Sequence, residues 1–327
     1  MLLRPLKKVF ESIENFIMQK KIKSIIVAIS GGQDSILLLK IFDELKHKLP
    51  TIEKISYIYI DHQWKANSYK HIQHLINHIK SYKKNLIIYQ ICKNINSENE
   101  CRKQRYNLIH KHAHKYKYEL IITGHNSSDK IETSLQNINR SSGQEGLSSP
   151  VIANQTNDEI FLLRPMLEID KEKVYFLCKK LNLPIWSDST NYIYHIERNR
   201  LRYELIPYVR NFFSKKVEQN ILLSTKNHYY ENEYIKQNAN KLYLNSKHKN
   251  RIAINYQYIS RQHLILQIKT LQIFYMYNIN IKIHSNVVKK IINQMNKKKK
   301  EKKIVFEDQY YKHIINNQWL YIEMKVK

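Results

Sequence analysis

The sequence is poor in residues that bend or cross-link a chain. It has 5 glycines, 6 prolines and 3 cysteines in 327 residues. The cysteines, Cys92, Cys101 and Cys178, form no C-x-x-C pair, so neither a disulfide framework nor a zinc or iron–sulfur site is predicted. Apolar runs of the roughly 18 residues that a membrane span needs are also missing. We therefore expect a cytoplasmic protein in a reducing compartment, with no membrane partner.

Acidic residues are scarce beside basic ones. The chain carries 28 Asp and Glu against 55 Lys and Arg, a formal net charge of +27. Part of this excess is attributable to composition, since Lys, Asn, Ile and Tyr are abundant, as A+T-rich coding produces. The remainder favours a polyanionic partner, with nucleic acid as the leading candidate. The length allows a full α/β core and a second, smaller domain.

Two of the few glycines stand in one motif. Residues 24–29 are an apolar, β-branched run, residues 30–35 read Ser-Gly-Gly-Gln-Asp-Ser, and a helical pattern begins at Ile36. A strand, a small-residue turn and a helix in this order form a phosphate-binding arrangement, because the first helical N–H groups point at the anion. The alternative is an ordinary Gly-Gly turn. We expect nucleotide contacts from Ser30, Gly31, Gly32, Gln33, Asp34 and Ser35.

This loop lacks the lysine that a Walker A motif places after its glycines. Asp34 stands there instead. An acid beside bound phosphates is most simply explained as a ligand of Mg²⁺, so Asp34 is the candidate metal residue. The motif resembles the pyrophosphate loop of the N-type ATP pyrophosphatases, which cleave ATP between its α- and β-phosphates.

Strand and helix patterns alternate after the loop. Strands are expected at residues 24–29, 55–60, 86–91 and 120–123, with helical patterns between them and an amphipathic helix at 6–20. This alternation predicts an α/β fold with a doubly wound, Rossmann-like parallel sheet. Ligands of such sheets lie beyond the carboxyl ends of the strands. The phosphate loop, Asp61-His62 and Gly124-His125 are expected to meet there.

Two histidines and two arginines are further candidates near this edge. His62 and His125 each follow a predicted strand and can contact the nucleotide, although a histidine packed over a helix start is nearly as common. Glu98, Arg102 and Arg105 share one face of the next helix. On physical grounds alone, a surface Glu–Arg pair is the better explanation of that face.

Carboxylates and arginines follow in two later segments. Asp129 and Glu132 share a helical face near the ligand edge, where they can hold a cation or an ammonium group; helix-dipole complementarity is the alternative. Arg198, Arg200 and Arg202 form a dense basic cluster suited to phosphate contacts.

Taken together, these motifs resemble the tRNA(Ile)-lysidine synthetase family over about residues 20 to 210. The resemblance rests on S-G-G-x-D-S, D-H, E-x-x-x-R-x-x-R-Y, H-x-x-x-D-x-x-E-T, R-x-S-G, L-R-P-x-L, D-S-T-N and R-N-x-L-R, in that order. The related tRNA thiolases share the phosphate loop but rely on reactive or cluster-binding cysteines. A thiolase and a non-catalytic basic RNA-binding protein are the two alternatives.

The resemblance implies a reaction and its participants. ATP adenylates the carbon 2 oxygen of the wobble cytidine in the CAU anticodon of tRNA(Ile), and free L-lysine then displaces AMP, so that the tRNA reads AUA in place of AUG. ATP and Mg²⁺ are the implied cofactors, and a homodimer is plausible by family. The implied catalytic residues are Asp34, Asp129, Glu132 and Arg198. Contacts to lysine or tRNA are implied for Arg102, Arg105, Asp129, Glu132, Asn199 and Arg202.

The chain departs from the family pattern at several positions. Asn126 and Ser128 stand where a second histidine and a second acid are usual, and Ser141 stands where a glycine is usual. Residues 63–65 read Gln-Trp-Lys in place of a G-L-R-like string.

The pattern changes after about residue 211. We expect a catalytic domain at 1–212, a helical connector at 213–250 and a mostly helical tRNA-binding domain at 251–327. Helices are predicted at 212–244, 261–277 and 285–295, and short strands at 303–306 and 319–322, after a lysine-rich run at 297–303. The segment resembles the first C-terminal domain of longer family members, and we expect their last domain to be absent.

Overall fold

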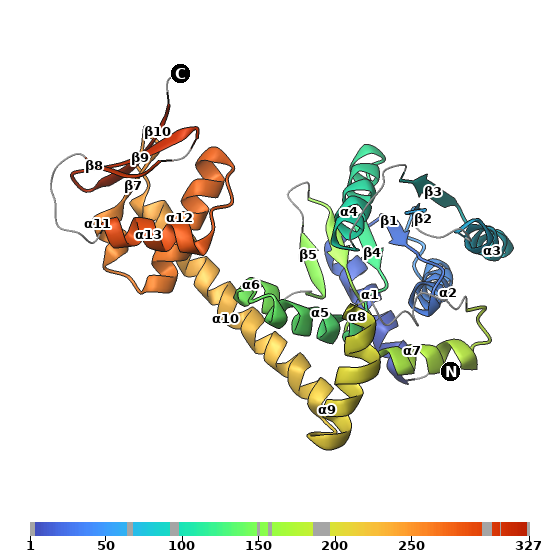
Figure 1. The fold of residues 1–327 in the computed structure, drawn as a ribbon. Helices are drawn as coiled ribbons and strands as arrows, with labels where there is room; N and C mark the ends of the chain where they lie inside the picture. Colours follow the sequence, from blue (N-terminus) through green and yellow to red (C-terminus); the bar gives the residue numbers. More distant parts are fainter. Residues whose placement is uncertain are drawn as a thin grey trace. The chain divides into compact units, whose positions relative to one another are not determined.

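The computed structural model describes residues 4–63, 68–91, 98–148, 151–155, 159–185, 197–295, 303–307 and 309–325. It divides into two compact units, Met1–Thr225 and Lys226–Lys327. The boundary falls inside the long helix α10 (Val217–Ser246), within the segment expected to be a helical connector (Figure 1).

A central sheet organises the first unit. Within the described residues it has six strands: β1 (Ser24–Ala28), β2 (Lys54–Asp61), β3 (Leu86–Gln90), β4 (Leu120–Thr123), β5 (Ala153–Gln155) and β6 (Phe161–Leu163). Their order is β3-β2-β1-β4-β6-β5, and every pair is parallel except β5 with β6. The predicted α/β class and parallel sheet are confirmed. Strand β5 was not expected, since Ala-Asn-Gln carries no apolar alternation.

Helices cover both faces of this sheet (Figure 1). Alternate residues of β1 enter different cores, because successive strand side chains point to opposite faces. Ile25 and Val27 pack with α1 (Arg4–Lys20), α2 (Gln33–Lys48), α3 (Ser68–Ser81) and α7 (Lys171–Lys180). Ile26 packs on the other face with α4 (Glu98–Lys115). This two-sided burial explains why the strands read as continuous apolar runs.

The strand order reverses direction between β1 and β4. From β1 the chain moves outward to β2 and β3, and later returns to place β4 on the other side of β1. In an open α/β sheet, the loops that diverge at such a reversal leave a crevice at the carboxyl ends of the strands. The loop after β1 leads into α2, and the loop after β4 leads into α5 (Ser127–Asn139). The predicted site residues of both loops therefore lie at this point.

The second unit combines helices with a small sheet. Helices α11 (Tyr256–Ser260), α12 (Leu264–Ile279) and α13 (Ser285–Met295) share an apolar core with β7 (Ala253–Asn255), β8 (Lys303–Glu307), β9 (Tyr311–Asn316) and β10 (Trp319–Met324). As far as the structure describes this unit, the antiparallel order is β7-β10-β9-β8. The helix at 285–295 and both predicted strands are confirmed. Strands β7 and β9 are additions to a region that was expected to be mostly helical.

Candidate active site

The phosphate loop has the predicted strand-turn-helix form. Gly31 has φ of 78°, a conformation that L side chains rarely adopt, and Gly32 is the residue that precedes α2. The Ser35 hydroxyl donates to the Gly32 carbonyl over 2.9 Å and lies 3.4 Å from the Ser30 hydroxyl. The 16-residue helix α2 directs its N-terminal dipole toward this turn. The loop therefore presents backbone N–H groups and hydroxyls at the crevice.

The close approach of β4 to α2 favours a glycine at position 124. A Cβ built on Gly124 would lie 3.3 Å from the Asp34 Cβ, tighter than ordinary van der Waals contact. Gly124 therefore allows the end of β4 to lie against the first turn of α2.

Gln33 fastens the loop to α7. Its side-chain amide donates to the Lys171 carbonyl over 3.0 Å, and its own carbonyl accepts the Cys178 thiol over 3.4 Å. The backbone N–H of Gln33 is consequently the group left for its predicted nucleotide contact.

Asp34 is a partly buried acid whose positively charged neighbours do not fully compensate the ionised carboxylate. Burial, and then the negative charge of Asp129, raise its pKa to about 6 against lowering contributions from Asn126, Lys171 and Arg202. A bound cation would remove this destabilisation of the carboxylate. Mg²⁺ is commonly held by one or two carboxylates together with substrate phosphates, so Asp34 beside the phosphate loop fits that ion. The described residues contain no cluster of three His, Cys, Asp or Glu side chains that would form an all-protein metal site.

Asn126 links Asp34 to Asp129 and is fully buried. Its amide nitrogen donates to Asp34 Oδ1 over 2.9 Å, while its amide oxygen accepts the Asp129 N–H over 3.0 Å. The Asp129 carboxylate in turn accepts a hydrogen bond from the Asn126 N–H over 3.1 Å, which completes a capping box at the start of α5. One residue thus caps α5 and orients the proposed metal ligand.

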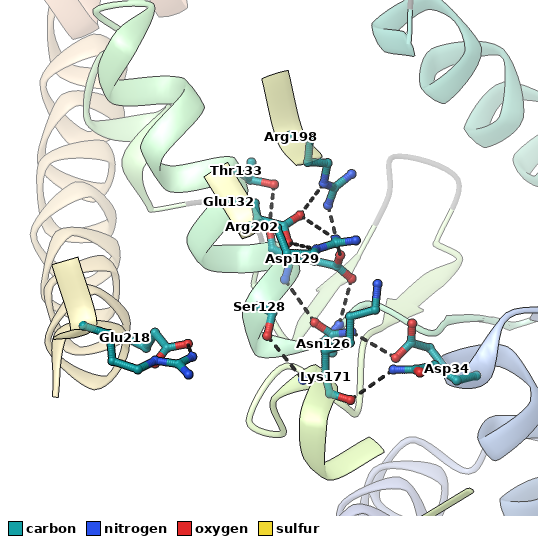
Figure 2. A network of polar contacts seen from close by, with 12 residues as sticks. Asp34, Asn126, Ser128, Asp129, Glu132, Thr133, Lys171, Arg198, Arg202 and Glu218 are labelled. Atoms are coloured by element: carbon teal, nitrogen blue, oxygen red, sulfur yellow. Dashed lines mark hydrogen bonds and ion pairs between the residues drawn. The ribbon is translucent and has the colours of Figure 1, made fainter. Parts of the chain in front are cut away.

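Two arginines clamp the Asp129 and Glu132 carboxylates (Figure 2). Arg202 makes a bidentate contact with Glu132, with distances of 2.7 and 2.9 Å. Arg198 reaches Glu132 through Nε and Asp129 through a terminal nitrogen, the latter over 3.0 Å. Glu132 is completely buried, so its charge depends on these partners. Burial alone would raise the pKa of Asp129, but Arg198, His125 and Arg202 hold it below its usual value.

Both arginines come from one continuous helical segment: Arg198 lies on helix α8 (Glu197–Arg200), and Arg202 lies on the π-helical turn that follows it at Leu201–Leu205. The π-helical turn passes into α9 (Ile206–Phe212). Such turns are rare and are frequent at functional sites. Glu197 holds the start of this segment to the end of α5, because its carboxylate accepts from Gln136, Asn139 and Arg140.

His62 and Arg105 form a separate pair at the end of β2. Arg105 donates to His62 Nε2 over 3.1 Å. Burial, and then the Arg105 charge, lower the pKa of His62 to about 4, so the imidazole is neutral at physiological pH.

His125 stacks on Tyr106, with ring centroids 6.4 Å apart and an interplanar angle of 13°. Arg102 covers the Tyr106 ring at 5.8 Å. Burial is the main reason that the pKa of His125 falls to about 3.

Three buried polar atoms at this edge of the sheet have no hydrogen-bond partner within the described part of the chain. They are His62 Nδ1, the Tyr106 hydroxyl and Arg164 Nε. Buried polar groups are nearly always hydrogen-bonded, so these atoms mark positions where a polar ligand or water completes the site.

The structure therefore groups the predicted residues into two sets. Asp34, Asp129, Glu132, Arg198 and Arg202 form one connected cluster, whereas His62, Arg105, Tyr106 and His125 line the neighbouring strand ends. Asn199 is buried, and Arg200 pairs with Glu204 on the exposed side. The D-S-T-N motif, Trp64-Lys65 and most of the lysine run lie outside the described residues.

Lys171 belongs to this site and was missed by sequence analysis. It is the first residue of α7, and it interacts electrostatically with Asp34, Asp129 and Glu132. Burial and the Arg202 charge lower its pKa. The sequence did carry one signal for Lys171. It follows the helix-capping residue Asp170 in the segment after β6, and that strand ends at the ligand edge. A lysine at the start of a helix is more commonly exposed to solvent.

Comparisons with known proteins identify the family of this chain. The PP-loop domain family matches residues 5–209. The chain is 43% identical over 300 residues to the chloroplastic tRNA(Ile)-lysidine synthase of Gracilaria tenuistipitata var. liui, covering 92% of each. It is 32% identical to that of Pyropia yezoensis (89% of this chain, 88% of the relative) and 34% identical to the Nostoc sp. PCC 7120 enzyme (67% and 64%).

One solved structure confirms the fold. The U34-tRNA thiolase NcsA from Methanococcus maripaludis, with its [4Fe-4S] cluster, superposes with a TM-score of 0.58 over 69% of this chain and 79% of that chain. The two are 13% identical, so this likeness concerns the fold alone. From the matched PP-loop domain and the curated relatives that align along nearly its whole length, the chain belongs to the tRNA(Ile)-lysidine synthase family.

Proposed function

We propose that this protein ligates lysine to carbon 2 of the wobble cytidine in the CAU anticodon of tRNA(Ile), with cleavage of ATP to AMP and pyrophosphate. The product lysidine switches codon reading from AUG to AUA and tRNA identity from Met to Ile. The observation that carries the proposal is 43% identity to a tRNA(Ile)-lysidine synthase across 92% of the chain. The phosphate loop and the connected acid–arginine cluster supply the groups that this chemistry needs.

In the first half-reaction, the cytidine carbon 2 oxygen attacks the α-phosphate of ATP. The loop N–H groups and the Ser30 hydroxyl bind the phosphates, while the Ser35 hydroxyl holds the turn through the Gly32 carbonyl. Asp34 is the residue that would hold Mg²⁺, which neutralises phosphate charge when bound. Asn126 keeps the Asp34 carboxylate aimed at the loop. His62 and His125, which are neutral at physiological pH, remain the proposed neighbours of the nucleotide.

In the second half-reaction, the ε-amine of free L-lysine attacks carbon 2 and AMP leaves. An amino acid zwitterion carries both signs of charge, as does the cluster of Asp129, Glu132, Arg198 and Arg202. We place the lysine subsite beside this cluster, with Asn199 behind it. Because both arginines already bind Glu132, the role of Glu132 is to position their guanidinium groups.

The tRNA is the polyanion that the net charge of +27 suits. An anticodon loop is single-stranded, so its bases are open to contacts from Arg102 and Arg105 beside the stacked Tyr106–His125 pair. We assign the second unit to tRNA binding outside the anticodon.

The assembly and the compartment are proposals of the same kind. A homodimer follows the family, and light scattering would measure it. The described residues include no helix of the length and apolarity needed to cross a membrane. We keep the cytoplasmic location as the prediction, and name the chloroplast as its competitor, because two of the relatives are chloroplastic.

A tRNA thiolase is the competing enzyme, and the cysteines argue against it. Cys101 and Cys178 are buried, form no disulfide and belong to separate cores. Burial raises the pKa of Cys178 to about 12, so it forms little thiolate at neutral pH. Cys92 lies outside the described residues. Lysine ligation that survives replacement of all three cysteines by Ser would exclude the thiolase.

The deciding experiment supplies radiolabelled lysine, ATP and Mg²⁺ with an unmodified tRNA(Ile) transcript carrying CAU. We expect label in the tRNA with wild-type protein and none with Asp34→Ala. ATP cleavage to AMP without label would indicate another adenylating enzyme. The absence of both reactions would favour the non-catalytic RNA-binding alternative.

A further inference from the structure

The phosphate loop lacks a lysine, yet the cluster beside it contains one. Three helix starts meet at Lys171: its carbonyl accepts the Gln33 side chain of α2, and its N–H donates to the Ser128 hydroxyl of α5 over 3.2 Å. Lys171 itself opens α7, where Asp170 caps the helix by accepting the Lys173 N–H. The backbone of Lys171 is thus held on both sides, although these elements lie far apart in the sequence.

The side chain of Lys171 extends into the acid–arginine cluster. Figure 2 shows it between the carboxylates of Asp34 and Asp129, the two acids with which it also interacts electrostatically. A lysine at the first position of a helix lies near the positive end of the helix dipole, which disfavours its charge. Burial of the side chain adds a cost of desolvation. The surrounding acids offset this cost, and a bound polyanion would do the same.

We propose that Lys171 supplies, from α7, the phosphate-binding cation that the loop after β1 lacks, and that its ligand is the β,γ-pyrophosphate of ATP. This inference rests on the proposed ATP-dependent function and adds a residue to it. Asp34, the acid that faces Lys171, belongs to the first turn of α2, where the phosphates are expected. The convergent starts of α2, α5 and α7 reinforce an anion site at that position.

The proposed step balances without a proton from the enzyme. The bond between the α-phosphorus and the bridging oxygen breaks as the bond to the cytidine oxygen forms, and the departing pyrophosphate takes the electron pair. Its added negative charge develops beside the Lys171 ammonium, which stays protonated throughout. A point charge at that position stabilises the transition state more than the ground state, so its main effect falls on kcat.

The test compares Lys171→Met with Lys180→Met, a matched change on the exposed end of the same helix. Calorimetry with Mg²⁺ measures the affinity of the full chain for inorganic pyrophosphate, independently of turnover. We expect Lys171→Met to weaken pyrophosphate binding at least tenfold and to lower kcat for AMP release about 100-fold. The KM for lysine should stay within twofold, and Lys171→Arg should recover much of the pyrophosphate affinity.

Unchanged pyrophosphate affinity in Lys171→Met would overturn the proposal. A lower KM for lysine in that variant would also overturn it, because it would show that Lys171 occupies the subsite of the substrate ammonium. If Lys171→Met does not fold, as judged by its melting curve, Lys171→Gln and Lys171→Arg carry the same comparison. Failure of wild-type protein to make lysidine would refute the proposed function, whereas the calorimetric result would still decide the role of Lys171.

Discussion

The side-chain amide of Asn126 donates to Asp34 over 2.9 Å, while its oxygen caps α5 through the Asp129 N–H. Removing this amide breaks a buried hydrogen bond and a helix cap together. Asn126→Ala should therefore reduce the free energy of unfolding by about 2 to 3 kcal/mol, measured by urea denaturation.

Asn126→Asp separates the two roles. It keeps a capping oxygen but places a third carboxylate beside Asp34 and Asp129. We expect a smaller loss of stability at pH 5 than at pH 8, because protonation relieves the repulsion among the acids. Equal losses at both pH values would contradict the electrostatic part of this account.

Asp34 should make the ligand-free protein less stable at neutral pH. Its pKa is raised from 3.8 to about 6, so the folded state favours the protonated acid, and the cost of ionisation grows as pH rises between these values. Asp34→Asn should add about 3 kcal/mol at pH 8 and nothing at pH 3.5. The two values come from urea denaturation in the absence of nucleotide.

The same carboxylate predicts the pH dependence of catalysis. Mg²⁺ binds the ionised form, so the affinity for MgATP should rise as pH increases through about 6 and level off above it. Asp34→Asn should remove the rise and the activity together. A pH-independent affinity in the wild type would argue against metal binding by Asp34.

Glu132 should be essential to the cluster even without touching a substrate. It is fully buried and receives both Arg198 and Arg202. Glu132→Gln removes the negative charge that balances the two guanidinium groups. It should reduce the free energy of unfolding by about 3 kcal/mol or more and should also lower the activity. Glu197→Gln is the control: Glu197 is 43% exposed, and its ion pair with Arg140 is worth at most about 1 kcal/mol.

Ser141 has a φ of 51°, which lies in the left-handed region that favours glycine. Its side chain is exposed, so replacement loses little packing. Ser141→Gly should increase the free energy of unfolding by about 0.5 to 1 kcal/mol, because it relieves backbone strain. Thermal denaturation checks this. Asn280, with φ of 54°, offers a second site for the same substitution.

Arg105 should keep His62 neutral and oriented. Burial is the larger cause of the low pKa of His62, and the Arg105 charge is the next. Arg105→Met should raise that pKa from about 4 while leaving it below 6.5, as followed by NMR titration. A full return to 6.5 would mean that burial contributes nothing.

Local sequence was sufficient to predict much of the fold. The apolar runs of β1 and β4, the Gly31-Gly32 turn and the helical period after it identify a strand, a loop and a helix, because each signal lies within a few neighbouring residues. Strand β5, with no apolar pattern of its own, forms through pairing with β6. β7 likewise pairs with the distant β10.

The sequence by itself determined which chemical groups meet at the carboxyl edge of the sheet, because the alternation of strands and helices dictates where each strand ends. Tertiary structure decided their partners. Glu132 meets Arg198 across 66 positions, Asn126 meets Asp34 across 92, and Gln33 meets Lys171 across 138. Charge balance at a buried acid depends on such contacts in space. Hence the sequence identified Asp129 and Glu132 as candidate site residues. Only the fold showed that they form ion pairs with Arg198 and Arg202, and that Lys171 lies near Asp34.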